Sequence, residues 1–103
     1  MKAIIKKVGQ LAEVVEIENT LKAMQTVVGG YIEIYPMPYD KKVDLVFNEE
    51  GKFGLQPNVA FPEINDILFG DILVVGVGRQ GANIGLDKLQ ARQAIIWLNM
   101  RGI

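Results

Sequence analysis

The chain has 103 residues, half of them hydrophobic, which predicts one folded domain over residues 1–103 with a real core. Its 11 basic and 12 acidic residues leave a net charge of −1, which excludes the broad positive field expected of a protein that binds DNA or an anionic membrane. Cysteine and histidine are absent, which excludes disulfides, thiol catalysis and the usual zinc sites and removes the commonest general base.

Two strand-like runs around Gly9-Gln10 make up the first segment, Lys2–Glu18. Glycine at the first central position favours a two-residue type II′ hairpin between them. The apolar stretch at the N-terminus is too short for a signal peptide, and no segment reaches 18 apolar residues. We therefore expect a soluble, cytoplasmic protein.

A short helix is predicted next. Asn19 or Thr20 can cap its start by accepting a hydrogen bond from an otherwise unpaired N–H group. Gly29-Gly30 can take the left-handed conformation that ends a helix. Three apolar residues share one face of the predicted helix: Leu21, Met24 and Val28.

Several strands follow the predicted helix. Tyr31–Tyr35 alternates between apolar and polar faces, as a half-buried strand does, and the prolines after it are expected to end it. Val43–Phe47 predicts another strand, and Asn48–Lys52 predicts its turn. Phe53–Asn58 is expected to pair back only briefly, because Pro57 lacks a backbone donor.

The final helix is predicted from Asp87, its cap, to Met100. At 100° per residue its apolar side chains form two arcs on nearly opposite sides. We expect one arc to pack on the sheet and the other, which includes Ile95 and Leu98, to contact a second copy of the chain. A homo-oligomer is therefore predicted. One arc consists of Leu89, Ile96, Trp97 and Met100. The other, the predicted contact surface, consists of Ala91, Ala94, Ile95 and Leu98.

The apolar run Ile67–Val75 ends in an interior strand, which completes the order strand–strand–helix–strand–strand–strand–helix. This order predicts an α+β fold, with a mainly antiparallel sheet of about five strands and two helices.

The stretch DILVVGVGRQG (Asp71–Gly81) spells the G-x-G-x-x-G pattern of dinucleotide-binding turns. That fold also needs an immediate helix, a return strand and an acidic residue, and this chain supplies none of them. We predict a strand end and loop outside any Rossmann unit, and no cofactor. The loop is either a backbone cradle for an anion, assisted by Arg79, or a flexible connection.

Polar and aromatic residues supply the other candidates. Asn48 and Asn58 flank the NEEGK turn, where their amides either fix the loop backbone or bind a ligand. Adjacent Glu49 and Glu50 point apart and are typical of a solvated turn rather than of paired catalytic acids. Two tyrosines, Tyr31 and Tyr35, share one strand face and either pack at an interface or stack on a base.

Three stretches, VGGYIEI (28–34), VFNEEGKFGLQPN (46–58) and FGDILVVG (69–76), resemble the domain-of-unknown-function family numbered 3846. The resemblance covers nearly the whole chain and implies a small protein of bacteria, bacteriophages or mobile elements. Members commonly have a proline where this chain has Gln56 and a basic residue where it has Val59. If that basic residue serves an anion, the contact is lost here.

The resemblance implies a phage or mobile-element origin, and the missing histidine and cysteine argue against catalysis. We therefore expect a non-enzymatic accessory protein that counters host defence, and three functions are considered. In the leading hypothesis the chain sequesters an anionic, nucleotide-like signal. In an alternative, its C-terminal helix docks on a host protein and inhibits it. Catalysis by Glu49 or Glu50 ranks last. The ligand-binding residues under the first hypothesis are Asn48, Lys52, Asn58 and Arg79, with Tyr31 or Tyr35 stacking on a base.

Overall fold

The computed structural model describes all of residues 1–103 and confirms the α+β class. Neither of its two α-helices is long and apolar enough to cross a membrane. The elements, in chain order, are β1 (Lys2–Lys6), β2 (Glu13–Glu16), α1 (Leu21–Val28), β3 (Ile32–Met37), β4 (Asp40–Asn48), β5 (Pro57–Phe61), β6 (Asp66–Phe69), β7 (Ile72–Val77), β8 (Asn83–Ile84) and α2 (Lys88–Met100).

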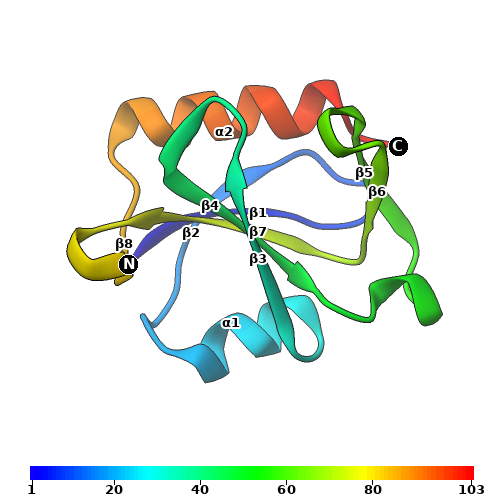
Figure 1. Cartoon of the computed structure of the whole chain (residues 1–103), viewed down its shortest axis with the longest axis horizontal. Helices are drawn as coiled ribbons and strands as arrows, with labels where there is room; N and C mark the ends of the chain where they lie inside the picture. The colour runs from blue at the N-terminus through cyan, green and yellow to red at the C-terminus, as the bar shows by residue number, and fades with distance from the viewer.

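The main sheet has the strand order β2-β1-β7-β4-β3, and the short β8 also pairs with β7. Every pair of neighbouring strands is antiparallel. Strand β7 lies at the centre, and Ile72–Gly76 are all buried, as the apolar run predicted for an interior strand. A separate two-stranded sheet, β5-β6, lies at one end of the molecule (Figure 1).

The two helices cover opposite faces of the sheet, α2 above and α1 below in Figure 1. The larger core cluster lies under α2, and within it Phe61 packs edge-on against Tyr35 and Trp97, with ring centroids 5.3 and 5.4 Å apart. A smaller cluster, which includes Met24 and Val28, lies under α1. Both sides of the sheet are therefore buried in part.

The predicted helix ends are confirmed. Thr20 Oγ1 accepts a hydrogen bond from the Ala23 amide at 3.1 Å, and Gly29 ends α1 with φ of 80°. At the start of α2, Asp87 and Gln90 form a capping box, in which each side chain accepts from the other's backbone N–H.

Some local predictions were wrong. The turn Lys7–Gln10 closes with a hydrogen bond from Gln10 N to Lys7 O, and Gly9 is its third residue with φ of 74°, which rules out the two-residue II′ turn. Pro36 does not end β3 but lies within it, because β3 is an edge strand and needs no donor on its free side. Of the three apolar residues expected on one face of α1, Met24 and Val28 are buried but Leu21 is exposed.

Candidate functional site

Four of the six predicted ligand-binding residues come together at the end of β4. Two neighbouring pockets, of about 310 and 210 Å³, share Asn48 and Glu49. Tyr31 lines the larger pocket, and Tyr35 and Lys52 line the smaller. The structure thus brings these four residues near one another, around two pockets rather than one.

Arg79 does not join this group. In the β4–β7 ladder Val46 pairs with Leu73 and Val43 with Gly76, so residue 48 lies beyond one end of the ladder and residue 79 beyond the other. The two loops accordingly lie at opposite ends of the longest axis in Figure 1. A single ligand held by Asn48 and Arg79 together is incompatible with this register.

Asn58 is fully buried and its amide is used internally. Its Oδ1 accepts from Lys6 Nζ at 2.7 Å, while its Nδ2 donates to the carbonyls of Lys6 and Gly70, both at 2.8 Å. The ligand-binding role predicted for Asn58 needs correction, because no face of this side chain is open to a ligand.

The pockets around Asn48 are acidic. Glu33, Glu49 and Asp66 line the smaller one, and its cation, Lys52, forms an ion pair with Asp66 at 2.6 Å. The hydrogen bond from Lys52 to Asp66 within this ion pair is the main reason why the pKa of Asp66 lies below its ordinary value. Carboxylates repel phosphate, so this surface is poorly suited to the anionic ligand expected from the sequence.

The amide of Asn48 also has internal partners. Its Oδ1 accepts from the Glu50 amide at 2.8 Å, and its Nδ2 donates to the Val28 carbonyl at 3.2 Å. This is the loop-fixing role that the sequence left open as one of two alternatives.

The glycine-rich loop joins two paired strands and has no Rossmann geometry. Gly76 and Gly78 lie against β8, where a Cβ on Gly76 would come within 2.9 Å of the Ile84 carbonyl oxygen and a Cβ on Gly78 within 2.8 Å of Ile84 Cγ2. Arg79 is exposed on the short turn that follows. The two glycines therefore allow the close approach of β8, a strand that the sequence did not predict.

The assignment of the two faces of α2 was wrong. Leu98 is 0% exposed and belongs to the larger core cluster, and Ile95 is half-buried against the same cluster. On the outer side, Ile96 is 52% and Met100 76% exposed, and Leu89 is exposed with them. The exposed apolar surface is therefore formed by three residues of the opposite arc, whose fourth residue, Trp97, is buried in the core.

A groove of about 730 Å³ runs between this outer arc and the tip of the β3–β4 hairpin. Its volume exceeds that of both pockets around Asn48, and its walls are mainly apolar side chains of α2. Its lining residues are Tyr39, Asp40, Leu89, Gln93, Ile96, Trp97, Met100 and Arg101.

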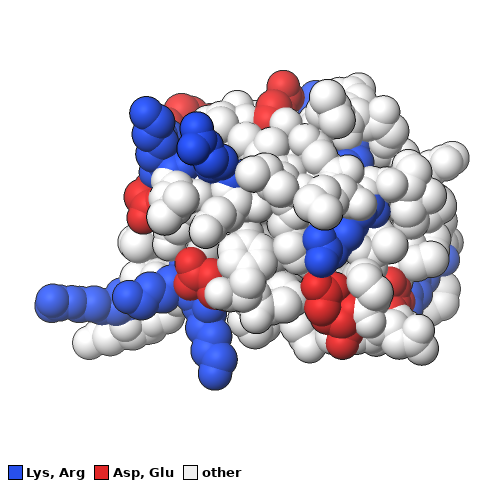
Figure 2. Space-filling model, turned by 90° about the horizontal axis from the view of Figure 1, so that it is seen from above, with Lys and Arg blue, Asp and Glu red and all other residues white.

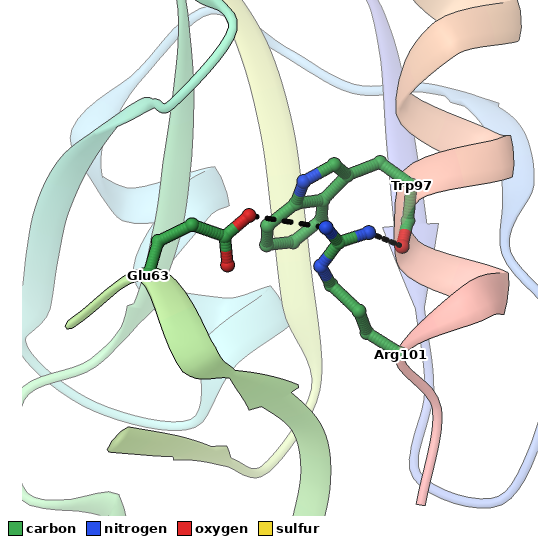
Figure 3. A network of polar contacts seen from close by, with 3 residues as sticks. All are labelled: Glu63, Trp97 and Arg101. Carbon is green, nitrogen blue, oxygen red and sulfur yellow. Dashed lines mark hydrogen bonds and ion pairs between the residues drawn. The ribbon is translucent and has the colours of Figure 1, made fainter. Parts of the chain in front are cut away.

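Arg101 anchors one end of the groove (Figure 3). Its guanidinium carbon lies 4.3 Å from the centroid of the Trp97 ring, its Nη2 contacts Glu63 Oε2 at 3.0 Å, and its Nη1 donates to the Trp97 carbonyl at 3.3 Å. A cation stacked on an indole stabilises the arrangement. Arg101 follows Trp97 by one helical turn, a spacing that could have indicated this contact from the sequence.

Tyr39 forms part of the opposite wall. Burial raises the pKa of Tyr39 to about 12, with nearby Asp40 acting in the same direction and Arg101 against it. The pKa of Tyr39 in the folded chain lies above its ordinary value of 10.0. The uncharged phenol therefore contributes its full stabilisation below pH 10.0. This contribution is lost as the pH rises through the folded pKa.

A titration tests this placement of Tyr39. In near-ultraviolet absorbance after a rapid pH jump, we expect one of the three tyrosines to ionise near pH 12, because partial desolvation of the Tyr39 phenol and the nearby Asp40 carboxylate both disfavour the phenolate. Tyr39→Phe is expected to remove that step. If the step persists in Tyr39→Phe, the raised pKa belongs to another tyrosine.

Comparison with known proteins identifies a family. The profile described as Domain of unknown function (DUF3846) matches residues 1–98. No curated protein and no solved structure matches the chain. Since the profile covers all but the last few residues, the chain belongs to the DUF3846 family.

Proposed function

We propose that this chain is a non-enzymatic accessory protein that docks on a partner protein through the groove between α2 and the β3–β4 hairpin. One observation carries the proposal: the outer face of a capped helix presents Leu89, Ile96 and Met100 to solvent beside a groove of about 730 Å³. Exposed apolar side chains gathered beside a groove are typical of interaction sites.

The groove offers contact area rather than acid–base chemistry. The carboxylate of Asp40 accepts from the Lys42 amide at 2.9 Å, and Arg101 is paired with Glu63. Both charged groups in the lining therefore have partners within the chain. Apolar walls with an aromatic and an arginine at one end are typical of protein interfaces.

In keeping with the resemblance, we propose a phage or mobile-element setting in which the docking inhibits a host protein. A chain without cysteine needs no oxidising compartment, and we place its action in the cytoplasm.

Capture of a nucleotide-like molecule is a second candidate, favoured by one observation. The rings of Tyr31 and Phe53 are both exposed beside the pocket of about 310 Å³, and exposed rings can stack on a base. Glu49 and Glu50 line the same pocket and oppose a phosphate. This acidity is why we rank capture below protein docking.

A pull-down with matched variants separates the two. We expect the wild-type chain to retain a polypeptide from a bacterial lysate, Ile96→Lys to lose it and Tyr31→Ala to keep it. Losing a central interface contact typically costs about 2 kcal/mol or more, roughly 30-fold in affinity. Because Ile96 is exposed, its substitution is expected to leave the free energy of unfolding within about 0.5 kcal/mol.

Two results would contradict protein docking. One is a polypeptide retained equally by wild type and Ile96→Lys. The other is a retained small molecule that is lost only in Tyr31→Ala, which supports capture instead. Sedimentation of the wild type and Ile96→Lys in parallel shows whether the retained polypeptide is a second copy of the chain.

A further inference from the structure

The apolar stripe on α2 has the dimensions of a helix-binding surface. Leu89, Ile96 and Met100 are spaced by seven and four residues on one side of the helix, and at 1.5 Å per residue the stripe is about 16 Å long. A partner helix of about three turns, with its own apolar stripe, matches this length.

Both sides of the stripe are basic. Lys88 and Arg92 lie beside it on α2, with Arg92 rotated about 40° from Ile96 around the helix axis. On the other side, the residues that follow Asp40 bring two lysines to the hairpin. Four exposed basic residues lie within two positions of a lining residue in the sequence, although none lines the groove itself, and they form no ion pair within the chain: Lys41, Lys42, Lys88 and Arg92.

The nearby carboxylates do not cancel this charge. Asp40 is hydrogen-bonded to the Lys42 amide and Asp87 to the Gln90 amide, and these two acids face four basic side chains. In Figure 2, which views the face that carries α2, blue side chains gather towards the end where α2 begins, next to a wide uncharged surface. Although the chain has a net charge of −1, positive charge therefore predominates near this groove.

We propose that the groove binds an acidic amphipathic helix of a partner protein, an inference that rests on the proposed protein-docking function. The apolar stripe supplies the contact area, and the basic flanks select carboxylates on either side of the partner's own stripe. A second copy of the chain fits less well because it would bring basic flanks against basic flanks. Nucleic acid would leave the apolar stripe without a matching surface.

A display library of helical peptides of about 16 residues, roughly four turns, tests the charge of the occupant. The library is selected on the wild-type chain and counter-selected on Ile96→Asp. We expect enriched peptides to carry apolar residues at helical spacing and a net negative charge. For a selected peptide, Lys88→Glu combined with Arg92→Glu is expected to weaken binding about 10-fold or more, since each reversed charge turns attraction into repulsion.

The matched control is Lys7→Glu with Lys22→Glu, two exposed basic residues outside the groove, which is expected to leave affinity within about 2-fold. Enrichment of neutral or basic peptides overturns the acidic occupant while leaving docking at Ile96 intact. If no peptide is enriched, the proposal that the groove binds a helix is overturned. The helix is also overturned if no peptide is enriched while a duplex RNA or phosphatidylserine vesicles bind the wild-type chain but not Ile96→Asp.

Discussion

Leu98→Ala is expected to lower the free energy of unfolding by about 2–5 kcal/mol, because the substitution leaves a cavity in a fully buried site. Leu98 is 0% exposed and lies in the same core cluster as Phe61 and Trp97. Domains of this size have total stabilities of about 5–15 kcal/mol, so the loss is a large fraction of the whole. Urea denaturation followed by circular dichroism measures it.

Ile96→Ala is the matched control, since it truncates a side chain on the same helix that faces solvent. We expect it to change the free energy of unfolding by no more than about 0.5 kcal/mol. The opposite pattern, with Leu98→Ala stable but altered in its sedimentation and Ile96→Ala destabilised, would restore the interface predicted from the sequence.

Asn58→Ala is expected to destabilise the fold by about 3–5 kcal/mol, because it leaves a buried ammonium group without its acceptor. Lys6 is 3% exposed, and its Nζ donates to Asn58 Oδ1 at 2.7 Å. Burial already lowers the pKa of Lys6, which Asp71 partly opposes. The same substitution also strands the carbonyls of Lys6 and Gly70.

Asn48→Ala provides the comparison. The Asn48 amide is only partly buried and makes two hydrogen bonds, one with the Glu50 amide in the turn and one with the Val28 carbonyl. We expect it to cost about 1 kcal/mol. Combining Lys6→Met with Asn58→Ala should recover part of the loss, with a coupling energy of about 1–3 kcal/mol. If Asn58→Ala leaves the denaturation midpoint unchanged, the buried amide does not hold Lys6 as described.

Local patterns were enough to predict much of the fold. The caps of both helices and the buried run of β7 depend on neighbouring residues, and all were predicted correctly. For α2, periodicity defined two apolar arcs but not which one meets the sheet. Ala91 and Ala94 were the missed signal, because such small side chains let a helix approach a sheet closely, and both are buried.

The candidate site was harder to predict because it depends on long-range placement. Asn58 is a polar residue near a turn in the sequence, and only its contact with Lys6, on a distant strand, shows that it is a core residue. Likewise, the register of β4 against β7 separates Arg79 from Asn48, and no local pattern encodes that register. The groove itself needs the β3–β4 hairpin to fold back over α2.

The position of β7 has a consequence for how the chain reaches its native state. Hairpins β1–β2 and β3–β4 each form between neighbouring strands of the chain, but they do not pair with one another. They are joined only through β7, where Val74 pairs with Ile4 of β1 on one side and with Leu45 of β4 on the other. During synthesis both hairpins emerge well before the strand that unites them. Because such non-local pairing closes large loops late, we expect folding to be slow and cooperative, with the edges of β1 and β4 open to aggregation until β7 has paired with them.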